Sequence, residues 1–177
     1  MSPAAGMFLV AAPHLGDPNF MRSVVYLLRH GEDGSMGLIV NRPLPMPLSE
    51  IWDETPEGLR DAQVVAEGGP VDRHQGLLLH GDPSLPGCQP LAADLAIGGE
   101  RAALAVRYAR GPDGSGPRLF LGYAGWGPGQ LAEEIAEGAW LLRPGSALHV
   151  VMAPDHDLWQ RLLAGGSAVG PPAPSLN

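Results

Sequence analysis

Glycine and proline interrupt this chain so often that no secondary-structure element in it can be long. The 177 residues include 25 glycines and 19 prolines, and both residue types weaken the interior of a helix or a strand. Between these interruptions lie short apolar runs rich in β-branched and aromatic residues, which are typical of strands. The pattern predicts strands at residues 7–12, 23–28, 36–40, 63–66, 76–79, 91–97, 118–123, 139–142 and 147–152.

Helical signals are fewer than strand signals. They predict helices at 49–52, 101–109, from Pro128 onward and at 157–163. Turn residues at 32–34 close a hairpin, and a second turn at 68–70 separates two further strands. The sequence therefore favours an α+β fold with a mixed, bent sheet and helices packed outside it, rather than a doubly wound parallel sheet. We expect one domain over 1–165 and a flexible Pro/Gly-rich tail over 166–177.

The charged residues exclude several kinds of chemistry. All eleven basic residues are arginines, against nineteen acidic residues and a net charge of -8. Without lysine the chain cannot form a Schiff base, attach pyridoxal phosphate or grip a nucleotide as a P-loop does. The negative charge also argues against direct nucleic-acid binding, which depends on a clustered basic surface. The nearest approach to a cluster is expected to be an ordinary solvated helix face, formed by Arg101, Arg107, Arg110 and Arg118.

Neither a metal nor a cofactor is expected. The single cysteine, Cys88, cannot form a disulfide within the chain, and the six histidines include no HxH or HExxH pair. No apolar run approaches the roughly 20 residues that span a bilayer. We therefore expect a soluble cytoplasmic protein without a membrane segment.

The most distinctive stretch is the glycine-rich segment 122–131, which is expected to run from a strand through a loop into a helix. Pro128 suits the first position of that helix, where free N–H groups can bind an anion. Glu133 and Glu134 disfavour a phosphate there. Two interpretations stay open: a structural turn with Trp126 packed beneath it, which we favour, and a loop that faces a ligand.

Polar residues bracket the first predicted hairpin, and a Ser/His/Asp set can be drawn from them, although spacing alone cannot assemble a triad. No GxSxG motif is present. The simpler interpretation has Asp17 accepting backbone N–H bonds in its own turn, with Arg22 or Arg42 paired to a carboxylate.

Three segments together resemble the YqgE/AlgH family of bacterial proteins. The first is 12–26, continuing to His30 and then to 37–43. The second is 67–71 with 76–80, and the third runs from 121–126 through 129–135 to Trp140. They follow the order of the family and cover most of residues 7–165.

The resemblance implies more about fold than about function. It implies an α+β domain whose bifurcated sheet curls into a pseudo-barrel with helices around it. Family members are largely uncharacterised. The family name refers to the regulation of alginate production, and members are described as candidate transcriptional regulators. The resemblance supplies no established catalytic residue.

Three hypotheses follow for the function. The first is a non-catalytic, cytoplasmic regulatory protein that binds a protein or a small molecule through arginine forks, an aromatic face and orienting amides. Its expected binding residues are Arg22, His30, Asn41, Arg42, Trp126 and Gln130. The second is a hydrolase that uses His14 or His30 with Asp17, and the third is a structural partner in a complex with an exposed apolar patch.

Overall fold

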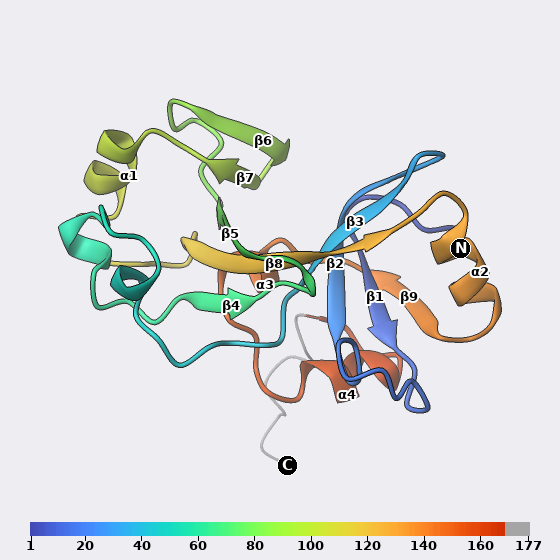
Figure 1. The fold of residues 1–177 in the computed structure, drawn as a ribbon. Helices are drawn as coiled ribbons and strands as arrows, with labels where there is room; N and C mark the ends of the chain where they lie inside the picture. Colours follow the sequence, from blue (N-terminus) through green and yellow to red (C-terminus); the bar gives the residue numbers. More distant parts are fainter. Residues whose placement is uncertain (169–177) are drawn as a thin grey trace, which may run out of the picture.

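The computed structural model describes residues 1–168 and contains one curled sheet with helices on its outer sides (Figure 1). The strands are β1 (Met7–Ala11), β2 (Val24–Gly31), β3 (Gly34–Ile39), β4 (Val65–Glu67), β5 (Val71–His80), β6 (Cys88–Ala92), β7 (Leu95–Gly98), β8 (Arg118–Trp126) and β9 (Trp140–Pro144). The α-helices are α1 (Arg101–Arg107), α2 (Gln130–Ala136), α3 (Leu148–Val151) and α4 (Leu158–Leu163), and two 3-10 turns lie at Leu48–Glu50 and Glu57–Leu59. The expected α+β class with a mixed, bent sheet is confirmed.

Strand β8 is the central strand of this sheet and pairs with three others. The strand order is β6-β7-β5-β8-β3-β2-β1-β9, and β4 pairs with β8 outside this path. Along one edge, β8 pairs first with β4 in parallel and then with β3 antiparallel, while β5 takes the other edge. The sheet therefore divides at β8, with β6, β7 and α1 at one end of the molecule and β1, β9 and α2 at the other (Figure 1).

The chain crosses over β8 between β4 and β5, and three glycines make this crossing possible. A Cβ atom on Gly68 would lie 2.3 Å from the carbonyl oxygen of Gly122, and one on Gly69 would lie 2.2 Å from the carbonyl carbon of Tyr123. Gly122 has a φ of 75°, and a Cβ atom on it would lie 2.4 Å from the carbonyl oxygen of Gly69. The crossing thus requires backbone packed directly on backbone.

Replacing Gly68 with alanine tests this packing alone, because Gly68, unlike Gly69 and Gly122, does not have a left-handed backbone conformation. The added methyl group would overlap backbone atoms that cannot move aside, so we expect Gly68→Ala to lower the free energy of unfolding by about 3 kcal/mol or more. Gly16→Ala is the matched control, since a Cβ atom there meets nothing within 4 Å. Urea unfolding of both variants measures the difference, and equal midpoints would contradict the close approach.

Alternating side chains give the sheet an apolar core on each face. Phe8, Val10, Val24 and Tyr26 point to one face, where α3 and α4 cover them. Their neighbours in sequence point to the other face, which α2 and the segment before β2 cover; these neighbours are Leu9, Ala11, Val25 and Leu27. A third cluster at the far end joins α1 and the 3-10 turns to β4 and β8. Successive side chains thus point to opposite faces of the sheet, as they do in any β-strand.

Several sequence predictions were wrong in detail. Residues 147–152 were expected to form a strand, but they contain the single turn of α3, whose Val150 and Val151 enter the first core. The expected strand 91–97 is a hairpin of β6 and β7. The strands predicted on either side of turn 68–70 are present as β4 and β5, and they lie on opposite edges of β8.

The basic residues near α1 also differ from the prediction. Arg118 does not belong to a solvated helix face: it begins β8 and is only 2% exposed. The guanidinium of Arg107 is not simply solvated, because it donates hydrogen bonds to three side chains, those of Asp82, Asp113 and Ser115. Of the expected tail, residues 166–168 belong to the described chain, and the rest lies outside the described residues. Within residues 1–168 no helix has the length and apolar character needed to cross a membrane.

The turn between α1 and β8 is fixed by Asp113. Ser115 donates to one carboxylate oxygen through its hydroxyl at 2.6 Å and its backbone N–H at 2.8 Å, and Arg107 donates to the other oxygen at 2.7 Å. The bonds from Ser115, and then the Arg107 guanidinium, lower the pKa of Asp113 from 3.8 to about 2. This carboxylate therefore stays charged throughout the physiological range.

The lowered pKa of Asp113 predicts a pH dependence of stability. A carboxyl group with a depressed pKa in the folded state contributes stability above its unfolded pKa, and loses it as the pH falls through the folded value. We expect Asp113→Asn to remove about 1 kcal/mol at pH 7, allowing for solvent screening of this half-exposed group, and almost nothing near pH 2. Thermal unfolding between pH 7 and 2 measures this, and a constant difference would contradict it.

Candidate functional site

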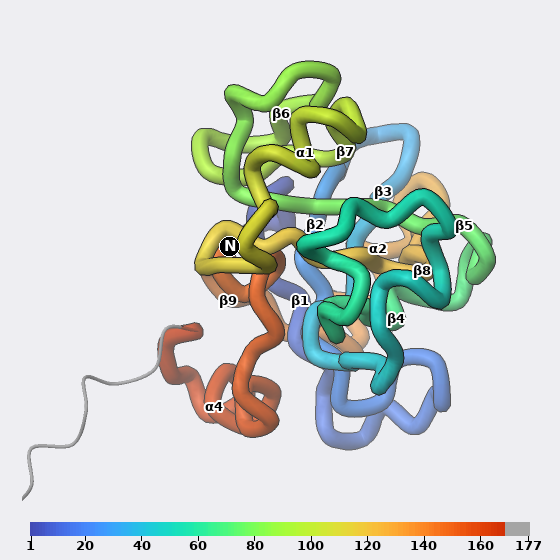
Figure 2. Tube along the Cα trace, turned by 90° about the vertical axis from the view of Figure 1, so that its left-hand side faces the viewer, coloured from blue at the N-terminus to red at the C-terminus, as the bar shows by residue number. Residues whose placement is uncertain are grey.

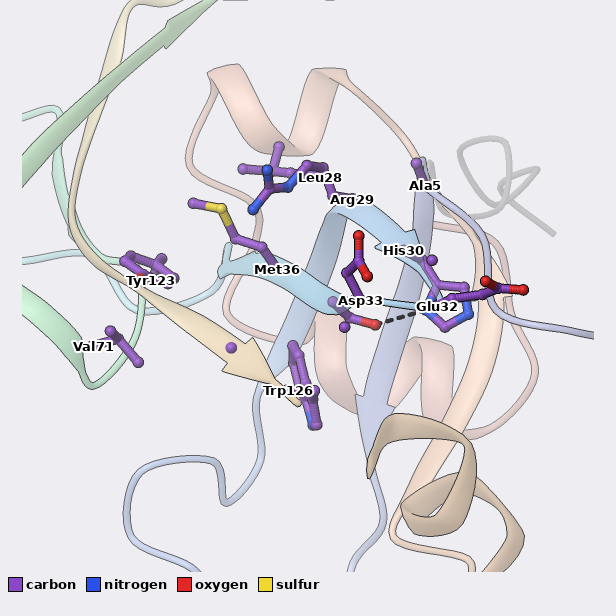
Figure 3. Close-up of a pocket in the computed structure, with 14 residues that line it drawn as sticks. Ala5, Leu28, Arg29, His30, Glu32, Asp33, Met36, Val71, Tyr123 and Trp126 are labelled. Atoms are coloured by element: carbon purple, nitrogen blue, oxygen red, sulfur yellow. Dashed lines mark hydrogen bonds between the residues drawn. The ribbon is translucent and has the colours of Figure 1, made fainter. Parts of the chain in front are cut away.

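A hollow of about 750 Å³ opens beside the tip of the β2–β3 hairpin, where the hairpin meets the end of β8 (Figure 3). We call it the hairpin hollow. Its lining residues come from the N-terminal segment, the hairpin and two strands, and they are Ala5, Leu28, Arg29, His30, Gly31, Glu32, Asp33, Gly34, Ser35, Met36, Val71, Tyr123, Gly125 and Trp126.

Strand register places different chemistry on the two sides of this hairpin. Residues paired directly across neighbouring strands point to the same face. Ser35 pairs with both His30 and Trp126, so these three side chains share one face. Met36 pairs with Arg29 and Gly125 and faces the other way. Figure 3 shows Met36, Val71 and Tyr123 on that second side, with Trp126 directed away from them.

The hairpin hollow has an apolar floor and a charged rim. Leu28, Met36, Val71 and Tyr123 are partly buried and form the floor. The exposed rim residues are Arg29, His30, Glu32 and Asp33. Apolar walls with a few polar groups at the mouth are typical of sites that bind small organic molecules or single side chains of a partner.

His30 stands between this hollow and a smaller one on the α2 side. The second hollow has a volume of about 350 Å³ and shares four residues with the first, His30, Gly31, Glu32 and Ser35. The Nδ1 atom of His30 and the Oγ atom of Ser35 are 2.6 Å apart, and the dashed line in Figure 3 marks this hydrogen bond. The tip of the hairpin is therefore reachable from both faces.

Two of the six predicted binding residues, His30 and Trp126, line the hairpin hollow. Gln130 lies outside both hollows and supports the glycine-rich loop: its Oε1 atom accepts from the backbone N–H of Gly127 at 2.9 Å. Helix α2 begins at Gln130 and not at Pro128, because Gly129 has a φ of 76°, which an α-helix cannot contain. Trp126 packs beneath this loop at 6% exposure, as the structural interpretation of segment 122–131 predicts.

Sequence reasoning missed the importance of Glu134. One of its carboxylate oxygens accepts from the indole Nε1 atoms of Trp126 and Trp140, at 3.1 and 2.9 Å, and the other accepts from Gln130 at 2.8 Å. The two indole rings meet edge to face, 5.9 Å apart. A tryptophan on either side of a helical glutamate is a weak signal, because it becomes specific only once the strands place both rings against the helix.

Removing the Glu134 carboxylate leaves three donors without their acceptor. We expect Glu134→Ala to lower the free energy of unfolding by about 2 to 4 kcal/mol, since two of these donors belong to buried indoles. The neighbouring Glu133→Ala is the control and is expected to change stability by less than about 0.5 kcal/mol. Denaturant unfolding followed by circular dichroism distinguishes them; similar values would show that the network is dispensable.

The other three predicted residues hold the segment before β2. Asn41 accepts from the N–H of Val24 and donates to the carbonyl of Arg22, both at 2.9 Å. Arg42 donates to the carbonyls of Asn19 and Met21. The predicted pairing of Arg22 or Arg42 with a carboxylate was wrong, because backbone carbonyls take the Arg42 fork and Arg22 lies over the ring of Trp159 at 6.0 Å.

The catalytic alternative gains no support from this geometry. Asp17 accepts from the backbone N–H of Asn19, as its turn chemistry predicts, and His30 bonds Ser35. Within residues 1–168 no histidine ring is hydrogen-bonded to a carboxylate, the arrangement that orients a general base. The described part of the chain also contains no group of three residues placed to hold a metal ion.

Comparison with known proteins identifies the family. The family model described as AlgH-like matches residues 8–167. The chain belongs to the AlgH-like family. It is 36% identical to the UPF0301 protein AlgH of Pseudomonas aeruginosa over 92% of this chain and 87% of that protein. A UPF0301 protein of Myxococcus xanthus is 40% identical over 93% of this chain and 92% of its own length. The family resemblance in the sequence is thus confirmed.

Two solved structures share the fold of this chain. The solution structure of AlgH from Pseudomonas aeruginosa superposes with a TM-score of 0.71 at 33% identity, covering 97% of this chain and 93% of that one. A crystal structure of a Corynebacterium diphtheriae protein gives a TM-score of 0.75 at 27% identity, covering 98% and 90% of the two chains.

Proposed function

We propose that this AlgH-like protein is a non-catalytic, cytoplasmic regulatory protein that acts by binding a small molecule or a segment of a partner protein in the hairpin hollow. The observation that carries the proposal is the combination found there: an apolar floor large enough for a small ligand and an exposed polar rim centred on His30. Sites of this composition bind ligands through shape and a few directional bonds.

The chemistry of the rim favours binding over catalysis. The hydroxyl of Ser35 is within reach of His30, but nothing in residues 1–168 bonds the other nitrogen of that ring. A serine nucleophile needs a base that a third group holds in the correct tautomer. The His30–Ser35 pair instead presents one donor and one acceptor that can orient a bound polar group.

Charge supports a protein or small-molecule partner over a nucleic acid. The chain carries a net charge of -8 and no lysine. At the hollow, two acidic residues, Glu32 and Asp33, outnumber the one arginine, Arg29. Phosphate backbones are attracted by an excess of positive charge, so a regulatory effect on transcription would act through another protein or a ligand.

The decisive test fills the hollow without disturbing the strand. A Cβ atom on Gly125 would point into ordinary contact distance of Tyr123 and Val71, at 3.6 and 3.9 Å, so a leucine there occupies the floor. We expect Gly125→Leu to change the free energy of unfolding by less than about 1 kcal/mol. Native mass spectrometry of protein purified gently from its own host should show a bound molecule or partner with the wild type and none with this variant.

Gly16→Leu is the matched control, because Gly16 is exposed and lies outside the hollow. It should retain the bound species at the level of the wild type. Equal loading of all three proteins would contradict binding in the hairpin hollow. A bound species that the protein converts into a product would contradict the non-catalytic assignment.

A further inference from the structure

Arg118 is a buried cation that has no anionic partner among residues 1–168. Its side chain begins β8, and the residue is 2% exposed. Among residues 1–168, no carboxylate lies within ion-pair distance, and the buried Nη2 atom has no hydrogen-bond acceptor. Burial lowers the pKa of this guanidinium to about 10. A buried charge that is left unpaired destabilises the folded state.

The contacts of Arg118 offset this charge only in part. Its guanidinium lies 4.9 Å from the centre of the Phe120 ring, a favourable cation–π distance. Its Nη1 atom donates to the carbonyl of His149 at 3.4 Å, which is long for such a bond. The planar guanidinium of an arginine is suited to two parallel hydrogen bonds with one carboxylate. Arg118 makes no such bond to a carboxylate within residues 1–168.

A hollow of about 460 Å³ adjoins Arg118 at the start of β8, at the opposite end of the strand from the hairpin hollow. Apolar side chains form much of its wall, namely Val64, Pro112, Pro117, Val151, Met152 and Ala153. The acidic wall residue is Asp113, whose charge is already paired with Arg107. Arg118 is therefore the uncompensated charge in this wall.

We propose that this hollow binds small monocarboxylates with a short apolar body, whose carboxylate pairs with the guanidinium of Arg118. The apolar walls match the body of such a ligand, and one positive charge matches one negative charge. The weak bond to His149 can be exchanged for the stronger, charge-assisted pair. A phosphate fits poorly, because it brings about two negative charges to a single cation beside a carbonyl oxygen.

The proposal is independent of the hairpin hollow, which shares no residue with this site. Titration of the purified protein with hexanoate tests it, with hexanamide as the neutral ligand of the same shape. Hexanoate at millimolar concentration should raise the melting temperature by about 2 °C or more and shift the amide NMR signals of residues around Arg118. Hexanamide and inorganic phosphate should bind at least about tenfold more weakly.

Arg118→Met removes the charge and keeps the length of the side chain, and it should abolish the difference between hexanoate and hexanamide. Arg60→Met is the control, since Arg60 is exposed and outside the hollow, and it should bind like the wild type. Equal affinity of the wild type for hexanoate and hexanamide would overturn the proposal, whether or not the Arg118 variant folds. So would equal affinity for phosphate, or full hexanoate binding by a folded Arg118→Met.

Discussion

The crossing of the chain over β8 is the constraint on which the rest of this structure depends. Gly68 and Gly69 pass so close to Gly122 that only hydrogen atoms fit between the two backbones. Because the chain crosses there, β4 and β5 take opposite edges of β8, and β3 is left to pair with its far half. The division of the sheet, and the different surroundings of its two ends, follow from this one contact.

The two ends of β8 carry the two proposed sites in different chemical settings. At its end lies the hairpin hollow, which Trp126 helps to line and whose rim charges are exposed. At its start, Arg118 brings a single charge into a largely apolar wall that includes Val151 of α3. Figure 2 shows β6, β7 and α1 gathered on one side of the molecule, with α4 on another. A ligand at the first site is recognised mainly by shape and by bonds to groups that remain solvated. At the second, recognition rests on pairing one desolvated charge.

The sequence predicted what depends on local pattern and failed where tertiary contacts decide. The apolar runs at 7–12 and 23–28, rich in strand-forming residues, predicted β1 and β2. Residues 147–152 have the apolar, β-branched composition of a strand. They form the single helical turn α3 because that turn packs Val150 and Val151 into the first core. His30 and Trp126 could be proposed as neighbours from the family motifs. Glu134 and Arg118 could not, because their roles arise from burial and from partners distant in sequence.

The glycine crossing also divides the molecule into parts with different freedom to vary. Any side chain at Gly68 or Gly69 collides with main-chain atoms, so this centre admits almost no change. Gly31 in the hairpin tip and Gly114 beside Pro112 are different: a Cβ atom on Gly114 or on the exposed Gly31 would meet nothing within 4 Å. An architecture that is rigid in its middle and permissive at its extremities can acquire a new ligand by altering a few peripheral side chains while the framework that presents them stays the same.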